Sequence, residues 1–210
     1  MQKIVLASGN VKKVKELSEL LANFDYQVIP QTDLNVSEVP ETGTTFVENA
    51  IIKARHAAKV TGLPAIADDS GIEIDYLNGM PGIYSARFAT LDDPNSQGNA
   101  DDQANNDLLL EKLKGVPTAE RGARYQCILV FMKHADDPTP IICQGSWEGR
   151  ILESETGDGG FGYDPLFWAP EHNCAAAELS PDQKAAISHR GKALRSLMEQ
   201  LSVLRTARNI

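Results

Sequence analysis

The first part of the chain alternates between strand-like and helix-like spacing of hydrophobic residues. Lys3–Ser8 is a short apolar run that predicts a buried strand. After a break at Gly9-Asn10, apolar residues recur on one face at helical spacing, at Val11, Val14, Leu17, Leu21 and Phe24. Tyr26–Pro30 predicts a second strand, so the chain starts as strand, helix and strand.

A polar loop and a second helix follow. Gln31–Gly43 contains proline, glycine and polar residues and predicts the loop. Thr44 or Thr45 is suited to cap a helix that runs to about Val60. One stripe of this helix is apolar and consists of Phe46, Ala50, Ala54 and Ala57.

Two carboxylates interrupt the next apolar segment. Ala65–Asp68 predicts a short strand that leads into Asp68-Asp69. Gly71 predicts a turn, and Ile72–Leu77 alternates as a further strand would. We therefore expect both aspartates at the end of a strand.

The second half of the chain predicts a helix and then a pair of strands. Leu91–Gln103 is acidic and predicts a loop before a helix over about Asn105–Lys114. Tyr125–His134 and Pro140–Glu153 predict two longer strands that form a hairpin.

The last segment, from Ser180 to about Arg205, is helical in pattern. It starts with a capping box, Ser180-Pro181-Asp182-Gln183, and Ser188 offers a second helix start. Strands that alternate with helices early, and a strand pair later, predict a mixed α/β fold with a partly parallel central sheet. We expect one domain over residues 1–210, with two lobes around a cleft.

Composition narrows the class of protein. The 210 residues include 20 Lys and Arg against 29 Asp and Glu, so the formal net charge is −9. Nucleic-acid and membrane binding need a basic face, and this balance argues against both partners. No apolar run approaches the ~20 residues of a membrane span. Cys127, Cys143 and Cys174 are odd in number and widely spaced, which favours reduced thiols and a cytoplasmic location.

The turn between the first strand and the first helix is a candidate phosphate site. It reads Ser8-Gly9-Asn10-Val11-Lys12-Lys13. Backbone N–H groups and the dipole at a helix N-terminus attract anions, and Lys12 or Lys13 adds a full charge. The P-loop motif is absent, and an ordinary turn with two solvated lysines is the alternative interpretation.

Acidic residues gather around the predicted strand end. Asp68 and Asp69 lie there, and Glu41 lies in the preceding loop. Such carboxylates suit Mg²⁺, which takes oxygen ligands and bridges to substrate phosphates. One of them could also act as a general base toward water. The alternative is a pair of aspartates that only form a turn before Ser70-Gly71.

Residues 157–162 match the glycine pattern of dinucleotide-binding proteins, but the context excludes that function. The pattern needs a preceding strand and a helix at its end, whereas Pro165 disfavours helical geometry at Asp164. A glycine-rich loop remains, which presents Phe161 and Tyr163 for stacking a base and Asp164 for accepting its N–H groups. A tight turn with buried aromatic residues is the alternative.

Three cationic side chains lie near the start of the last helix. Lys184, His189 and Arg190 could hold a phosphate or a base carbonyl, because Arg offers a planar fork of donors. The alternative is a solvated basic face. The other histidines and the cysteines lack metal-ligand spacing, which argues against a zinc site.

Six short blocks occur in a fixed order between Lys3 and about Leu201. They are Ser8-Gly9-Asn10-x-x-Lys13, Glu41-Thr42-Gly43-x-x-Phe46-x-Glu48-Asn49-Ala50-x-x-Lys53-Ala54, Ala67-Asp68-Asp69-Ser70-Gly71, Pro81-Gly82-x-Tyr84-Ser85-Ala86-Arg87, Gly160-Phe161-Gly162-Tyr163-Asp164-Pro165 and Lys184-x-x-x-Ser188-His189-Arg190-Gly191. Together they resemble the noncanonical purine nucleoside triphosphate pyrophosphatase family, the house-cleaning enzymes for inosine and xanthosine triphosphates. The segment Leu91–Asn106 departs from the family pattern by being longer and more acidic.

The resemblance implies a homodimer, Mg²⁺ as cofactor and a purine nucleoside triphosphate as substrate. Residues 8–13 and Lys53 would hold the triphosphate. Asp69 would be the acid–base residue and a metal ligand, Glu41 a second ligand, and Ser70 would touch the substrate; a direct metal contact from Asp68 stays open. The base would lie in a pocket made of Phe161, Gly162, Tyr163, Asp164, Lys184, His189 and Arg190.

The implied reaction is attack of water on the α-phosphorus, which gives a nucleoside monophosphate and pyrophosphate. Lys13, Lys53 and the metal would neutralise the leaving group. His189 or Arg190 would donate to the 6-oxo group of hypoxanthine or xanthine, whereas adenine places a donor there. The alternatives are a pyrophosphatase for modified pyrimidine nucleotides, a nucleotide-binding protein without turnover and a structural dimer.

Overall fold

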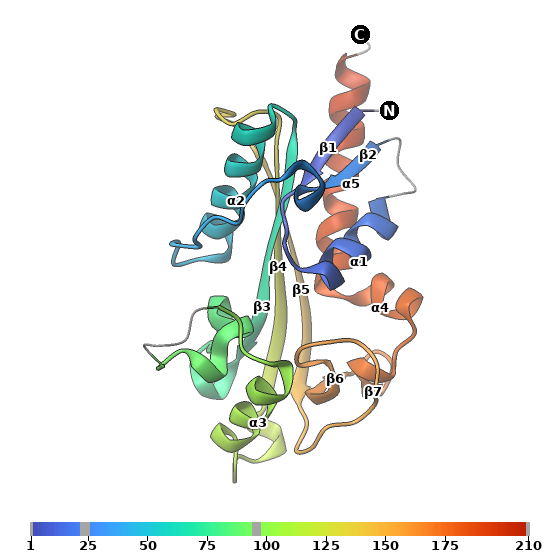
Figure 1. Cartoon of the computed structure of the whole chain (residues 1–210). Coiled ribbons are helices and arrows are strands. Elements are labelled where there is room, and N and C mark those ends of the chain that lie inside the picture. Colours follow the sequence, from blue (N-terminus) through green and yellow to red (C-terminus); the bar gives the residue numbers. More distant parts are fainter. Residues whose placement is uncertain (1, 22–25, 94–97, 209–210) are drawn as a thin grey trace. The chain divides into compact units, whose positions relative to one another are not determined.

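A mixed sheet organises the chain (Figure 1). The computed structural model describes residues 2–21, 26–93 and 98–208. The strands are β1 (Gln2–Leu6), β2 (Tyr26–Pro30), β3 (Ala65–Ile74), β4 (Gly122–Met132), β5 (Ile141–Ile151), β6 (Phe167–Ala169) and β7 (Cys174–Ala175). They pair in the order β2-β1-β3-β4-β5-β6-β7. Because β1 is parallel to both neighbours while β6 is antiparallel to β5 and β7, the predicted partly parallel sheet is confirmed.

Local signals explain where the helices begin and end. The helices are α1 (Val11–Leu21), α2 (Phe46–Thr61), α3 (Asp102–Lys112), α4 (Pro181–Ile187) and α5 (His189–Arg208). Thr45 and Glu48 form a capping box at the start of α2, and Gly62 ends the helix in a left-handed conformation. Ser188 has extended backbone angles and separates α4 from α5, as the second predicted helix start requires.

Residues 1–69, 127–145 and 190–210 contain one compact unit. Alternate residues of its strands point to opposite faces, so each strand serves two cores. In β4, Cys127, Leu129 and Phe131 pack with residues of α1 and α5. The intervening Ile128, Val130 and Met132 pack with the alanine-rich face of α2. Within this unit α2 therefore covers one face of the sheet, and α1 and α5 cover the other (Figure 1).

Residues 70–126 and 146–189 form the second unit. Its core joins Leu109 and Leu113 to Trp147 and Phe167, which are all fully buried. The guanidinium of Arg121 donates to the carbonyl oxygens of Leu113, Val116 and Leu152. The buried guanidinium is thus satisfied by backbone carbonyl groups that follow α3 and β5.

The structure corrects three predictions of local structure. The turn predicted at Gly71 is wrong, because β3 runs on to Ile74; the segment is buried on both faces, and sheet pairing outweighs the preference of glycine for turns. The strand predicted over Ile72–Leu77 therefore ends early, and residues 75–77 form a 3₁₀ turn. Asp164 also adopts helical geometry, in a 3₁₀ turn over Asp164–Leu166.

Other boundaries differ less. Helix α3 begins three residues before the predicted Asn105. Phe24 and residues 94–97 of the acidic segment lie outside the described part of the chain. None of the helices in that part is long and apolar enough to span a membrane.

Candidate active site

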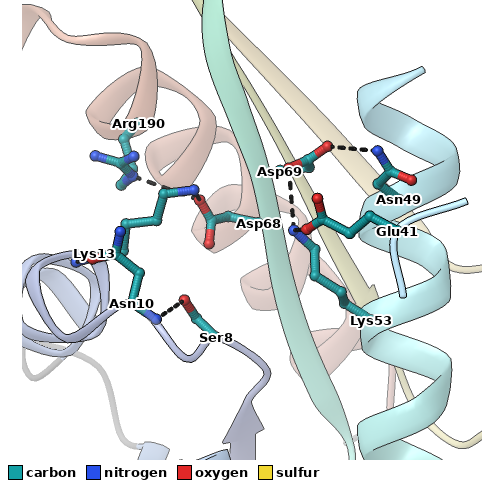
Figure 2. Close-up of polar contacts among 9 residues, drawn as sticks. All are labelled: Ser8, Asn10, Lys13, Glu41, Asn49, Lys53, Asp68, Asp69 and Arg190. Carbon is teal, nitrogen blue, oxygen red and sulfur yellow. Dashed lines mark hydrogen bonds and ion pairs between the residues drawn. The ribbon is translucent and has the colours of Figure 1, made fainter. Parts of the chain in front are cut away.

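Asp68 and Asp69 lie next to each other in β3 and face in opposite directions (Figure 2). This follows from strand geometry, because successive side chains of a strand alternate between its two faces. Both side chains are buried, with only 1% of Asp68 and 6% of Asp69 exposed. Buried carboxylates need charged or hydrogen-bonding partners, and the partners differ between the two faces.

Asp68 is surrounded by cations. Its Oδ2 lies 3.1 Å from Lys13 Nζ and 3.9 Å from Arg190 Nε. Burial acts to raise the pKa of Asp68, but the charges of Lys13, Arg190 and Lys53 outweigh it and hold the pKa well below its usual range. Asp68 is therefore a permanent anion that neutralises the cations beside it.

Asp69 has a different environment. Its Oδ1 lies 3.1 Å from Lys53 Nζ, and this ammonium also lies 2.8 Å from Glu41 Oε1. Burial raises the pKa of Asp69, and repulsion from Glu41 adds to the rise, against the opposing attraction of Lys53. Asp69 is therefore the carboxylate of the pair that is better suited to take up a proton.

Two side chains of α2 hold Asp69 in place. Asn49 Nδ2, on α2, donates to Asp69 Oδ2 across 3.2 Å, and Lys53 projects from the next turn of the same helix (Figure 2). The sequence analysis includes Asn49 in a motif block but assigns it no role. The available signal was a polar residue on the buried side of an otherwise apolar, alanine-rich stripe.

The predicted phosphate loop is built as a capped helix start. Asn10 N–H donates to Ser8 Oγ, and Asn10 Oδ1 accepts from Lys13 N–H at 3.1 Å, which caps α1. Val11 is 80% exposed, so the first turn is open to solvent. A Cβ atom on Gly9 would collide with the carboxylate of Glu38, so the Glu38 side chain packs directly against this turn. The side chain of Lys12 lies outside the described part.

A second cluster lies in the other unit and centres on Asp164. Its Oδ2 accepts from Lys184 Nζ at 2.5 Å and from Phe161 N–H at 2.8 Å. Its Oδ1 accepts from Tyr125 Oη at 3.3 Å. With these three donors and only 2% exposure, the carboxylate is an anchor that holds the glycine-rich loop and Lys184 in place.

The two aromatic residues of the glycine-rich loop are not equivalent. Tyr163 is buried and donates to Ser85 O at 2.8 Å; burial, helped by Asp102, raises the pKa of its phenol above the usual range. Phe161 is half-buried, and Lys184 Nζ lies 5.1 Å from its ring centroid. Phe161 is thus the more accessible of the two rings, whereas Tyr163 supports the loop.

Gly162 joins this loop to α3. Its N–H donates to Asp102 Oδ2, and its carbonyl accepts from Asn106 Nδ2 at 3.2 Å. Gly160 and Gly162 have φ angles of +74° and +62°, a conformation that favours glycine. Asp102 and Asn106 lie in the acidic segment that departs from the family pattern, so part of that segment holds the loop.

The structure separates two residues that the sequence analysis joined. His189 stacks on Tyr125, with ring centroids 4.7 Å apart and planes 10° from parallel. Arg190, the next residue, lies beside Asp68 in the other unit. His189 thus stacks on the tyrosine that donates to Asp164, whereas Arg190 lies beside Asp68 of β3.

The described residues contain no cluster of three or more His, Cys, Asp or Glu side chains that could hold a metal ion. Glu41 and Asp69 form a carboxylate pair, and Lys53 Nζ lies within 3.1 Å of an oxygen of each. Two oxygens that already share one cation are suited to a hard divalent ion whose remaining ligands come from phosphates and water. The donor set therefore fits Mg²⁺.

Residues 4–200 match the Ham1 family. The chain belongs to the Ham1 family. It is 61% identical over 202 residues to the dITP/XTP pyrophosphatase of Vibrio parahaemolyticus, which covers 96% of this chain and 98% of that protein. It is 56% identical over 201 residues to the dITP/XTP pyrophosphatase of Escherichia coli, with coverages of 96% and 98%.

A solved structure of the Ham1 family has the same fold. The HAM1 protein from Coxiella burnetii superposes with a TM-score of 0.86 at 48% identity and covers 96% of this chain and 99% of that one. These matches confirm the family that the six sequence blocks indicated. They also confirm the predicted mixed α/β fold.

Proposed function

We propose that this Ham1 protein hydrolyses inosine, deoxyinosine and xanthosine triphosphates to the monophosphate and pyrophosphate. The observation that carries the proposal is Asp69, a buried carboxylate with a raised pKa beside Lys53 and Glu41. A base and a cation at one point are what hydrolysis of a phosphoanhydride requires. The names of the Vibrio and Escherichia relatives support the substrate class.

Asp69 is the proposed general base. It accepts a proton from water as the water oxygen bonds to the α-phosphorus. The bond from this phosphorus to the bridging oxygen then breaks, and its electron pair leaves with pyrophosphate. Lys53, beside Asp69, and Lys13, on the opposite face of β3, supply positive charge to the triphosphate. The turn of residues 8–13 adds backbone N–H groups at the start of α1.

Glu41 and Asp69 would hold Mg²⁺, and the half-buried Ser70, which follows Asp69 in β3, would touch the substrate. When bound, the ion supplies charge neutralisation for the phosphates and lowers the pKa of coordinated water.

The proposed base site is the cluster around Phe161. Phe161 offers its ring for stacking, and Lys184 and His189 are donors for the 6-oxo group of hypoxanthine or xanthine. Adenine would place an amino donor against these donors, and a buried donor left unpaired costs about 1–3 kcal/mol. This mismatch favours the oxo-purines over adenine.

Product analysis tests the reaction and the substrate class together. The purified protein is incubated with Mg²⁺ and with inosine, xanthosine, adenosine, guanosine or deoxyuridine triphosphate. Pyrophosphate from the first two, and little from the rest, is the expected result. Orthophosphate as first product would contradict the proposed bond, turnover of deoxyuridine triphosphate would favour a pyrimidine enzyme, and binding without turnover would leave a nucleotide-binding protein.

We also propose a homodimer and a cytoplasmic location. The dimer rests on the resemblance to the family, and the location is supported by three free cysteines, two of them buried. Analytical ultracentrifugation of the full chain should give about twice the 22.8 kDa mass of one chain. A single species at the mass of one chain would contradict the dimer.

A further inference from the structure

Asn49 is a buried polar residue to which the proposed reaction assigns no role. Its side chain is 0% exposed and lies in the first turn of α2. The other residues buried on this helix are Ala50, Ala54, Ala57 and Ala58. A primary amide costs desolvation energy among such neighbours unless both of its ends are hydrogen-bonded.

The orientation of the Asn49 amide is fixed by its partners. Gly43 N–H, which can only donate, lies 2.9 Å from Asn49 Oδ1. The oxygen must therefore face Gly43, and the Nδ2 donor must face Asp69 Oδ2, 3.2 Å away. Asn49 thus connects the turn at Gly43 to the proposed general base.

The turn at Gly43 carries Glu41 and is held by two adjacent side chains of α2. Glu48 Oε2 accepts the N–H groups of Thr44 and Thr45, at 2.8 and 3.0 Å. Together with the bond to Asn49, three consecutive backbone N–H groups are bound to the start of the helix. The position of Glu41 is therefore set by the same helix turn that holds Asp69.

There is little space for this turn to move. A Cβ atom on Gly43 would lie 2.5 Å from Glu48 Cβ and 2.8 Å from Asn49 Oδ1. Any side chain at residue 43 must therefore displace one of these two residues. Substitution of Gly43 consequently disturbs Asn49 without removing its amide.

We propose that Asn49 is a positioning residue for the hydrolysis: its amide holds Oδ2 of Asp69, turns Oδ1 toward Lys53 and fixes the separation of Asp69 from Glu41. The inference rests on the proposed function, because it assigns to Asn49 the orientation of the proposed base. Its loss leaves the Asp69 carboxylate able to rotate about its Cβ–Cγ bond. The hydrogen bonds described for the Asn49 amide go to Gly43 and Asp69, so we expect turnover to fall while substrate binding is retained.

The experiment compares Asn49→Ala, Asn49→Asp and Gly43→Ala with the full-length parent protein. For Asn49→Ala we expect kcat for inosine triphosphate to fall about 10–100-fold, as for residues that orient a ligating carboxylate, with KM within about threefold. For Asn49→Asp we expect a larger fall in kcat, because a carboxylate then faces Asp69 in place of a hydrogen-bond donor. Gly43→Ala should also lower kcat, although it keeps the Asn49 amide, because it displaces Asn49 or Glu48.

Two binding measurements add readouts that do not depend on turnover. Titration of each protein with Mg²⁺ alone, followed by calorimetry, should show weaker binding in Asn49→Ala by about 10-fold, since the two carboxylates are no longer held at a fixed separation. Titration with inosine triphosphate in a metal chelator should give the same affinity as the parent. Unchanged Mg²⁺ affinity together with unchanged kcat would overturn the inference.

Asn105 is the matched control, because its amide is also buried and hydrogen-bonded at both ends, but to backbone groups instead of a carboxylate. It is 3% exposed, its Oδ1 accepts from Ala89 N–H at 2.8 Å, and its Nδ2 donates to Ala86 O. Asn105→Ala should lower the melting temperature and leave kcat within about twofold. An equal fall in kcat for Asn105→Ala and Asn49→Ala would overturn the inference, because both would then act through loss of structure.

The design separates this inference from the proposed function. If Asn49→Ala does not fold, the isosteric Asn49→Asp and the Gly43→Ala variant, which keeps the amide, decide the question. An Asp69→Asn protein with normal turnover would refute the proposed function and, with it, the role of Asn49. An inactive Asp69→Asn protein beside a fully active, folded Asn49→Ala protein would refute the role of Asn49 alone.

Discussion

On one face of β3 the Asp68 carboxylate lies 3.1 Å from Lys13, and its pKa falls; on the other face Asp69 lies 3.1 Å from Lys53, and its pKa rises. The two residues have the same side chain, the same distance to a lysine and similar burial. What differs is the remaining charge. Asp68 also has Arg190 nearby, whereas Asp69 shares its lysine with Glu41.

The comparison shows that one nearby lysine does not decide the state of a buried carboxylate. Burial acts to raise both pKa values, and the balance of the surrounding charges determines whether it is overcome. A carboxylate with surplus cations becomes a fixed counter-ion. A carboxylate in a group with two acids and one lysine keeps an affinity for protons, which a general base needs.

The largest expected effect comes from Asp69→Asn, which keeps the shape of the side chain and removes the proposed general base. We expect kcat to fall about 10³-fold with KM little changed, since positioned general bases contribute roughly 10²–10⁴-fold. Steady-state kinetics and far-ultraviolet circular dichroism check turnover and folding in the same preparation. A loss of less than tenfold would place the base elsewhere.

Asp68→Asn should act on stability instead. The substitution leaves the partly buried Lys13 and the buried Arg190 beside a neutral group, and removal of one partner from a buried ion pair costs about 3–5 kcal/mol. Urea denaturation at pH 7 measures the change, with Asp69→Asn as the control, which should change the free energy of unfolding far less. Equal destabilisation by both variants would remove the distinction between the two faces.

Substitutions of the two lysines should also have different effects on the kinetic constants. Lys53→Met removes the cation beside the base and should lower kcat, whereas Lys13→Met should mainly raise KM for inosine triphosphate by about tenfold, the value of one charged contact of ~1.5 kcal/mol. Steady-state kinetics with both variants tests this. Identical changes in kcat and KM would indicate that the lysines act as one group.

The smallest effect is in the pH dependence of stability. The folded pKa of Asp68 lies below its unfolded value, so its contribution is present above an unfolded pKa of about 3.9 and is lost as the pH falls through the folded pKa. The folded pKa of Asp69 lies above its unfolded value, so its contribution is present at low pH and is lost as the pH rises through the folded pKa.

Unfolding titrations from pH 3 to pH 7 check these opposite signs. The stability difference between parent and Asp68→Asn should grow in favour of the parent as the pH rises. The difference between parent and Asp69→Asn should shift in favour of the variant over the same range. The same slope in both comparisons would contradict the assigned directions.

Sequence patterns anticipated the elements with strong local signals. The capping threonine, the helical spacing of Val14 and Leu17, and the apolar run at Ala65–Asp68 all describe elements that the structure contains. Strands β6 and β7 were not predicted, because two or three residues are too few to show a period. Gly71 was misassigned because its local preference is outweighed by the pairing of a buried strand.

The sequence names candidate site residues, but it does not reveal the contacts that these residues make. Adjacent aspartates in a strand must face opposite ways, and this follows from the sequence once the strand is known. The separate environments of His189 and Arg190, the burial of Tyr163 and the link through Asn49 depend on tertiary packing. None of these contacts leaves a spacing that a single sequence reveals.

Hydrolysis of inosine triphosphate in oxygen-18-labelled water tests the central claim most directly. One turnover by the parent protein, followed by mass spectrometry of both products, locates the phosphorus that water attacks. Attack at the α-phosphorus, assisted by Asp69, predicts one labelled oxygen in inosine monophosphate, none in pyrophosphate, and no labelled product from Asp69→Asn in the same time. Label in pyrophosphate, or normal labelling by Asp69→Asn, would contradict it.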